Sequence, residues 1–158
     1  IRQEPSKFKQ ILNNMAVGEQ AAIFKTHTNV PLKREGRNIY LLSSGVGLAT
    51  FRPLALKYLN NTEHVTKIHS LNVDSSGHFL FTDIFKTDEA DKLTSEFVDS
   101  RDAYYSAAEK LAADKDALYY VVGSDEFLRQ NIELLLKAGI AKDQVMLDKH
   151  ESQRENFI

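Results

Sequence analysis

Apolar residues follow two alternating patterns along the chain. Short apolar runs predict strands, and they fall at residues 38–42, 65–72, 96–99, 118–122 and 144–147. Between the runs, apolar residues recur every three or four positions, which is the spacing of a helix face. Strands that alternate with helices are typical of α/β folds, in which right-handed crossovers build a parallel, doubly wound sheet. The pattern therefore predicts a five-stranded, Rossmann-like sheet.

Three of the predicted helices have recognisable faces or ends. The apolar face of the first comprises Phe51, Leu54, Ala55, Tyr58 and Leu59. The helix after the third run is predicted to begin at Asp102 as its N-cap. Its inward face is predicted to carry Ala103, Ala107 and Leu111. The last, leucine-rich helix is predicted to end with Gly139 at its C′ position.

The first 36 residues differ in character from the rest of the chain. Residues 5–12 predict a short helix with Ser6 as its N-cap, and residues 21–24 predict a strand. A segment of this size cannot bury enough apolar surface to fold alone. We therefore expect it to be the tail of a preceding β domain. The first residue is Ile1 and not methionine, so the chain is expected to be a piece of a longer protein.

A glycine-containing stretch follows the first predicted strand. Residues 43–50 read Ser-Ser-Gly-Val-Gly-Leu-Ala-Thr and lead directly into a predicted helix. Glycine allows positive φ and close approach of a ligand to the main chain, and a helix N-terminus offers unpaired N–H groups to an anion. Thr50 is the predicted N-cap, with Arg52 beside it and Pro53 in the first turn. The stretch predicts a phosphate cradle, although a plain glycine turn remains the alternative.

A second glycine follows the fourth predicted strand, at Gly123-Ser124. In α/β sheets, ligands bind beyond the carboxyl ends of the strands, where both glycine sites are expected to lie. Asp125 and Glu126 would satisfy the dipole of the second helix and repel a phosphate, which places the phosphate at the first. Helix capping is the alternative role for Ser124. The predicted phosphate contacts are Ser44, Gly45, Val46, Gly47 and Thr50.

Composition and charge exclude several classes of function. With 42% hydrophobic and 27% charged residues the chain can build an ordinary globular core. A net charge of −2 argues against nucleic acid as a partner. The chain has no cysteine, which excludes disulfides and thiolate chemistry, and its five histidines lack metal-ligand spacing. No apolar run has membrane-spanning length and no signal peptide is visible, so a cytoplasmic location is expected.

Several of these segments together resemble the ferredoxin–NADP reductase family. Residues 41–51 resemble the G-x-G-[IL]-[AT]-P-F segment that opens the family's pyridine-nucleotide domain. Residues 120–124, Tyr-Val-Val-Gly-Ser, resemble its Y-V-C-G-P segment, and residues 145–148, Val-Met-Leu-Asp, resemble its closing strand and acid. Residues 6–18 and 29–32 resemble the end of the family's flavin-binding β-barrel.

The resemblance implies a division of the chain and an activity. Residues 37–158 would be the NAD(P)-binding domain, and residues 1–36 would be the C-terminal fragment of the antiparallel flavin-binding barrel. The full-length protein would be a flavoprotein oxidoreductase that passes a hydride between NAD(P)H and bound FAD. Its further partner would be an electron acceptor, either a protein or a small molecule. The chain alone would be an incomplete enzyme.

The resemblance also assigns the adenosine end of the nucleotide. Ser100-Arg101 resembles the family segment that grips the 2′-phosphate of NADP, and arginine suits phosphate well. Asp74 falls where NADP-using members often carry arginine; its carboxylate could accept from a free ribose 2′-hydroxyl and would repel a 2′-phosphate. The two residues point to different cofactors, and the expected preference is for NADH.

At the other end of the nucleotide, Gly123 and Ser124 would border the nicotinamide. Three residues are predicted to lie near the flavin. Ser6 belongs to the barrel-like segment, and His150 stands where an aromatic residue often follows the closing acid. Phe157 is predicted to act as a terminal aromatic lid.

Two other functions stay open. Thr50 replaces the family's proline, and Val122-Gly123-Ser124 replaces its Cys-Gly-Pro. A non-catalytic module that senses nucleotides or interacts with partners could use the same fold, because fold does not determine function. A phosphate-binding enzyme of flavodoxin-like fold would leave the second glycine site unexplained.

The missing flavin motif leads to a first prediction. The family's R-x-Y-[ST] segment does not occur in the sequence, so the 158-residue chain should carry little or no flavin when purified. An absorbance spectrum of the purified chain measures this, and a stoichiometric flavin band would contradict the prediction.

Overall fold

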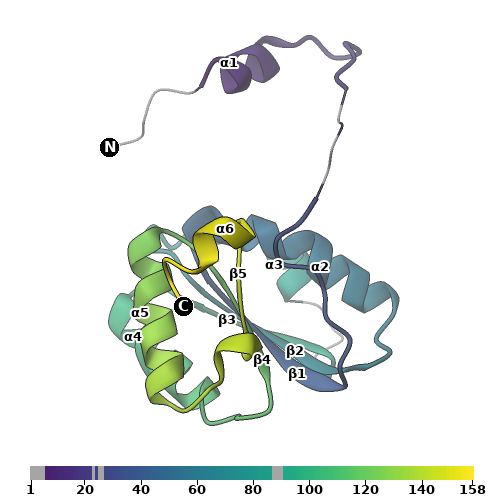
Figure 1. The fold of residues 1–158 in the computed structure, drawn as a ribbon. Coiled ribbons are helices and arrows are strands. Elements are labelled where there is room, and N and C mark those ends of the chain that lie inside the picture. The colour runs from purple at the N-terminus through teal and green to yellow at the C-terminus, as the bar shows by residue number, and fades with distance from the viewer. Residues whose placement is uncertain (1–5, 23, 25–26, 87–90) are drawn as a thin grey trace.

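The computed structural model describes residues 6–22, 24, 27–86 and 91–158. Its core is a five-stranded parallel sheet with the strand order β3-β2-β1-β4-β5 (Figure 1). The strands are Arg37–Ser44 (β1), Val65–Val73 (β2), Leu93–Val98 (β3), Leu118–Val122 (β4) and Val145–Leu147 (β5). The predicted doubly wound sheet is confirmed. β3 begins earlier than the predicted run at residues 96–99, because it pairs with β2 from Leu93 onward.

Helices cover both faces of the sheet. α4 and α5 pack on one face, and α2 and α3 pack on the other (Figure 1). The α-helices are Lys7–Asn14 (α1), Leu48–Asn60 (α2), Thr82–Phe85 (α3), Arg101–Leu111 (α4), Asp125–Lys137 (α5) and Glu151–Arg154 (α6). Two 3-10 turns, Gly45–Gly47 (η1) and Lys142–Gln144 (η2), complete the described elements.

The apolar side chains form two layers, one on each side of the sheet. Neighbouring residues of β1 point to opposite layers, so that Leu42 packs with α4 and α5 whereas Leu41 packs with α2. Both are fully buried. This is why the central strands consist of nearly continuous apolar runs and do not alternate with polar residues.

The predicted end of α5 is confirmed. Gly139 has φ +88, in the region that glycine adopts without strain. Its N–H donates to the Leu136 carbonyl at 2.9 Å, and the Ile140 N–H donates to the Leu135 carbonyl at 3.0 Å. This pair of hydrogen bonds is a Schellman motif, which satisfies carbonyls that the helix end would otherwise leave open.

The predicted start of α4 is wrong, and its predicted face is correct at Ala107 but not at Ala103. Ser100 is the N-cap, and its hydroxyl accepts from the Ala103 N–H at 3.4 Å. Asp102 lies inside the first turn, where its charge still suits the helix dipole. The buried face of α4 consists of Tyr104, Ala107 and Ala108, whereas Ala103 is exposed and Leu111 is half-buried.

The N-terminal segment matches its prediction only in part. Ser6 caps α1 as predicted, by accepting from the Lys9 N–H at 3.3 Å. Ala21, Ala22 and Phe24 do not belong to a strand, and residue 23 lies outside the described residues. The described part of residues 1–36 contains no strand. Its assignment to a flavin-binding barrel stays a prediction.

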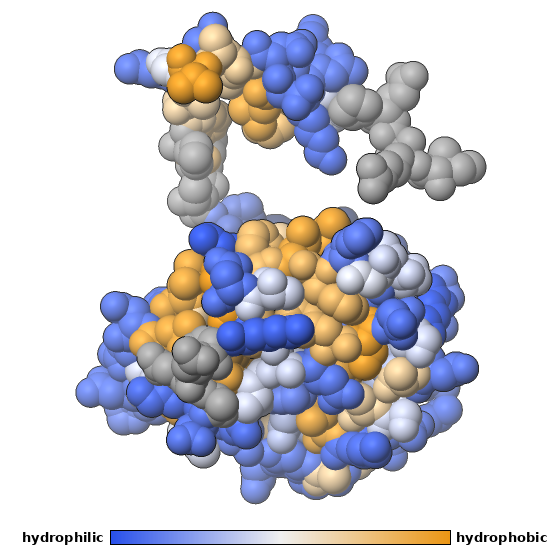
Figure 2. All heavy atoms as spheres, turned by 180° about the vertical axis from the view of Figure 1, so that it is seen from behind, coloured by the Kyte–Doolittle hydropathy of each residue, from blue (hydrophilic) through white to orange (hydrophobic). Residues whose placement is uncertain are grey.

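α1 stands apart from the sheet domain (Figure 1). It buries none of its residues, and its apolar side chains Phe8, Ile11 and Leu12 are exposed. Figure 2 shows apolar atoms both on the segment that carries α1 and on the sheet domain.

The residues just before β1, by contrast, pack onto the sheet. Val30 is buried in the layer that contains α2. The hydroxyl of Tyr120, in the centre of β4, donates to the Pro31 carbonyl at 2.8 Å and accepts from the Lys33 N–H at 3.0 Å. Burial raises the pKa of Tyr120 to about 12, so the hydroxyl keeps its proton for the first of these bonds.

Replacing Tyr120 with phenylalanine should therefore destabilise the chain. The Tyr120→Phe variant leaves a carbonyl and an N–H without their partner, which costs about 1–3 kcal/mol. Urea denaturation of the chain measures the loss. Tyr105→Phe is the matched control, because among the described residues its hydroxyl bonds only the partly exposed Gln130 side chain; it should cost about 0.5 kcal/mol or less. Equal losses in the two variants would contradict the prediction.

Candidate functional site

The glycine turn connects the end of β1 to the start of α2 without a loop. Gly45 has φ +53, which lets the chain leave the strand and enter η1 at once. Gly47 already has helical dihedral angles and is the N-cap of α2. The first N–H groups of this helix lie at the carboxyl edge of the sheet, and no acidic residue occupies its first turn. The turn can therefore present backbone donors to an anion.

The prediction that Thr50 caps α2 is wrong. Thr50 is the third residue of the helix, and Pro53 lies inside it. The physical reason is η1: its backbone starts the helical path at Gly45, so no side-chain cap is needed. The Thr50 hydroxyl donates to Asp148 at 3.4 Å, and Asp148 also accepts from Asn29 at 3.1 Å. Thr50 thus ties α2 to the end of β5.

Gly47 is required by packing. A Cβ at this position would lie 2.9 Å from the carbonyl oxygen of Val122, the last residue of β4. Glycine lets the start of α2 lie directly against the neighbouring strand. This close packing is sufficient to explain Gly47. Gly45 differs, because a Cβ there would point toward the Asp74 carboxylate at 3.8 Å.

A residue near the end of β2 holds the glycine turn through hydrogen bonds. Asn72 is buried, and its side-chain amide donates to the Ser43 hydroxyl at 2.8 Å and to the Gly45 carbonyl at 3.3 Å. Sequence analysis missed this residue. Its only signal is a polar side chain between Leu71 and Val73 in an otherwise apolar strand end.

A cavity of about 270 Å³ opens beside the turn. It lies over the carboxyl ends of β1, β2 and β3, between them and the first turns of α4 and α5. The residues that line it are Ser44, Gly45, Val73, Asp74, Ser75, Asp99, Arg101, Tyr104, Tyr105 and Phe127. Four predicted cofactor contacts meet here, namely Ser44, Gly45, Asp74 and Arg101. Val46 projects into solvent with 77% of its surface exposed.

Asp74 carries a negative charge into this cavity. It begins the turn after β2, and one of its carboxylate oxygens accepts from the Ser76 N–H at 2.9 Å and the Ser76 hydroxyl at 2.7 Å. These hydrogen bonds lower the pKa of Asp74. The group is therefore ionised at neutral pH and can accept a further hydrogen bond.

Arg101 lies across the same cavity but already has a partner. Its guanidinium contacts the Glu126 carboxylate at 3.2 Å, linking the starts of α4 and α5. Both side chains are about two-thirds exposed, so the pair is weak and its geometry is easily changed. Ser100, the other residue of the predicted phosphate grip, uses its hydroxyl to cap α4.

Gly123 and Ser124 have structural roles at the end of β4. A Cβ on Gly123 would lie 2.5 Å from the Phe127 ring. The Ser124 hydroxyl caps α5 by accepting from the Phe127 N–H at 3.3 Å. Asp125, in the first turn of α5, is paired with Lys149 at 2.7 Å. The capping alternative for Ser124 is thus present in the structure, and neither Gly123 nor Ser124 lines the cavity.

Each of the three residues predicted to lie near a flavin has a contact of its own in the structure. Ser6 caps α1, apart from the sheet. His150 caps α6, with its ring nitrogen Nδ1 accepting from the Ser152 N–H at 3.3 Å. Phe157 is partly buried against the layer that contains α5, with Arg129 4.8 Å from the centre of its ring. A flavin-facing role for these residues stays a prediction.

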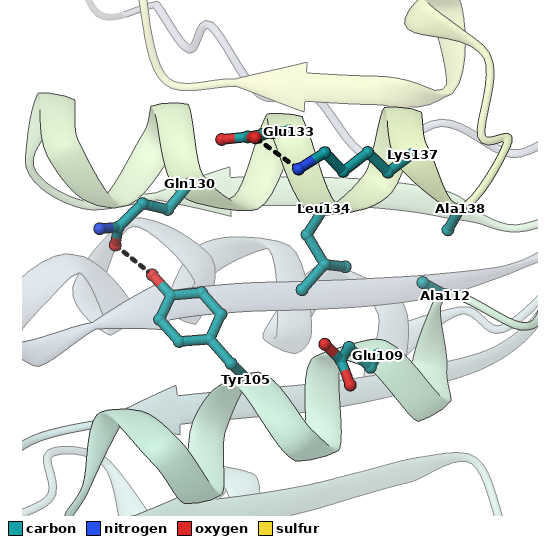
Figure 3. A pocket seen from close by; sticks show the side chains of 8 residues that line it. All are labelled: Tyr105, Glu109, Ala112, Gln130, Glu133, Leu134, Lys137 and Ala138. Atoms are coloured by element: carbon teal, nitrogen blue, oxygen red, sulfur yellow. Dashed lines mark hydrogen bonds and ion pairs between the residues drawn. The ribbon is translucent and has the colours of Figure 1, made fainter.

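A larger hollow of about 590 Å³ lies between the outer surfaces of α4 and α5 (Figure 3). Leu134 and Tyr105 project into it, and its rim carries the Lys137–Glu133 ion pair at 2.6 Å. It is an open groove between two helices, away from the strand ends. Tyr105 bonds Gln130 and Glu133 bonds Lys137, and none of the predicted cofactor contacts lines the groove, so the smaller cavity beside the glycine turn is the better candidate site.

Comparison with solved structures finds this fold in reductases. Human Ncb5or, in a structure of its CS-b5R domains in the NAD+ form, matches with a TM-score of 0.67 and 18% identity over 94% of this chain and 48% of that one. The ferredoxin reductase in carbazole 1,9a-dioxygenase matches with a TM-score of 0.54 and 20% identity over 72% of this chain and 37% of its own. An FAD apo form of the latter matches with a TM-score of 0.53.

These likenesses show the fold, which this chain shares with part of the Ncb5or structure and part of the ferredoxin reductase. The resemblance inferred from the glycine segments is confirmed at that level. The chain spans about half the length of the first structure, 48%, and 37% of the second. No family model and no curated protein matches the sequence. Within the part of the chain that the structure describes, no helix is long and apolar enough to cross a membrane.

Proposed function

We propose that residues 37–158 bind a pyridine nucleotide across the carboxyl ends of the strands, as the nucleotide half of a flavin-dependent reductase. One observation carries the proposal. Ser44 and Gly45, which open the glycine turn, meet Asp74 and Arg101 in one cavity at the sheet edge where α/β folds bind their ligands. The reductases that share the fold support the same class of ligand.

The residues at the turn fit a pyrophosphate. The N-terminus of α2 has backbone donors and lacks acidic side chains in its first turn. The N-terminus of α5 is the opposite case, because Asp125 and Glu126 occupy its first turn and would repel a phosphate. The pyrophosphate is therefore assigned to α2, with Ser44, Gly45 and Val46 as its contacts.

The cavity fits the adenosine end. Asp74 can accept a hydrogen bond from a ribose hydroxyl, whereas Asp99 adds a second acidic side chain to the same wall. Among the described residues that line the cavity, Arg101 is the only one with a cationic side chain, and Glu126 already pairs with it. The balance of charge favours NADH over NADPH.

The nicotinamide is assigned to the region beyond β4, with Gly123 and Ser124 bordering it. A reduced nicotinamide supplies a hydride when bound, and FAD in the full-length protein would accept it. The chain's own residues hold and orient the nucleotide. The electron acceptor would be a protein or a small molecule. A non-catalytic nucleotide-sensing module remains the second candidate, supported by the occupation of Ser124 in helix capping.

Gly45→Ala tests nucleotide binding at the turn. The added Cβ would enter the cavity beside Asp74, and we expect a loss of NADH affinity of about ten-fold, or 1.4 kcal/mol. Titration calorimetry on the 158-residue chain measures it. Gly36→Ala is the matched control, since Gly36 also has positive φ, +70, but no atom lies within 4 Å of its Cβ position.

Both glycine variants should lose similar stability, about 1 kcal/mol, because alanine is strained at positive φ. Only Gly45→Ala should lose affinity. Unchanged affinity in a folded Gly45→Ala chain, or equal losses in both variants, would argue against the proposed site.

The preference between the two nucleotides is a separate prediction. The wild-type chain should bind NADH more tightly than NADPH, because a carboxylate near a 2′-phosphate costs about 1 kcal/mol in water and more when desolvated. Asp74→Asn should reduce the difference between the affinities for NADH and NADPH, and Arg101→Ala should leave that difference nearly unchanged. Affinities of the three proteins for both nucleotides decide the matter. If the wild-type chain prefers NADPH and Arg101→Ala abolishes that preference, Arg101 and not Asp74 determines the choice.

A further inference from the structure

Two buried polar residues meet beneath the glycine turn. Ser43 of β1 and Asn72 of β2 are register partners, and each is at most 1% exposed. Burying an amide costs free energy unless it is hydrogen-bonded. Asn72 uses its amide for two bonds, to the Ser43 hydroxyl and to the Gly45 carbonyl. A side chain of one strand therefore holds the backbone of the turn that follows its neighbour.

The bond to the Gly45 carbonyl restricts a whole peptide group. The N–H of Leu48 donates to the same oxygen, so this carbonyl has two donors. The described residues contain no cis peptide bond, and in a planar trans peptide the carbonyl and the N–H point in opposite directions. With the Gly45 carbonyl held toward Asn72 in the sheet, the N–H of Val46 is directed away from the sheet, toward the solvent side of the turn.

We propose that Asn72 is a positioning residue for phosphate binding: it orients the Gly45–Val46 peptide so that the Val46 N–H faces the diphosphate of a bound nucleotide. The inference rests on the proposed function and adds to it a residue that does not touch the ligand. Asn72 acts through one backbone group, so its loss should affect the diphosphate part of a ligand and not the nucleoside part.

The experiment compares ADP with adenosine on the 158-residue chain, because the two ligands differ only by the diphosphate. Asn72→Leu has a side chain of similar size but no hydrogen-bond donor. Asn72→Asp also lacks the amide donor, and it adds a negative charge. Both variants should bind ADP and NADH about ten-fold more weakly, the worth of one charge-assisted hydrogen bond. Adenosine affinity should be unchanged. If both variants lose the same ADP affinity, the loss comes from the missing donor and not from the added charge.

Ser70→Ala is the matched control. Ser70 lies two residues earlier on β2, on the same face as Asn72, and its buried hydroxyl has no hydrogen-bond partner among the described residues. This variant should bind ADP as the wild type does. A purely structural role for Asn72 would lower stability but leave ADP affinity intact in the folded protein.

The outcomes separate the two proposals. Wild-type ADP affinity in a folded Asn72→Leu chain, or equal losses for ADP and adenosine, overturns the positioning role alone. A wild-type chain that binds neither NADH nor ADP overturns both proposals. If the Asn72 variants do not fold, the amide proton of Val46 in the wild type decides by NMR. It should shift downfield with ADP and not with adenosine, and an unmoved signal overturns the role.

Discussion

The close approach of Gly47 to the carbonyl of Val122 is the contact on which the candidate site depends. It brings the start of α2 directly against the last residue of β4. Any side chain at position 47 would push the helix away from that strand. The turn above β1 and the end of β4 are thereby held as one unit at the point where the strand order reverses. A ligand crossing this point would meet a rigid edge and not a flexible loop.

Two helix N-termini at this edge have different electrostatics. α2 begins without acidic residues and without a side-chain cap, so an anion at the turn that precedes it would meet no carboxylate of this helix. α5 begins with a serine cap and two carboxylates, each paired with a cation from outside the helix. Similar strand-glycine-helix segments thus differ in their helix N-termini: the N-terminus of α2 is suited to phosphate, whereas the dipole of α5 is already compensated by its own carboxylates. Arg101 connects the two regions, because it lines the cavity beside the glycine turn and also pairs with Glu126 at the start of α5.

Local patterns were enough to predict most of the fold. The apolar runs of β1 and β4 and the glycine that ends α5 are signals contained within a few neighbouring residues. The start of α2 was mispredicted, because Gly45 and Gly47 begin the helix through their backbone and Thr50 is not needed as a cap. The start of α4 differs for a related reason, since Ser100, and not Asp102, is the N-cap. Asn72 could not have been assigned, because its role depends on which strand lies beside β1.

The order of the strands also has a consequence for how the chain folds. β1 pairs with β2, which follows it after one helix, and with β4, which comes much later in the sequence. Bringing β4 to β1 closes the longer loop, and loop closure costs more entropy as the loop grows. The contact between Gly47 and Val122 can form only when β4 has joined. The packing of the glycine turn against β4 is therefore completed no earlier than the centre of the sheet.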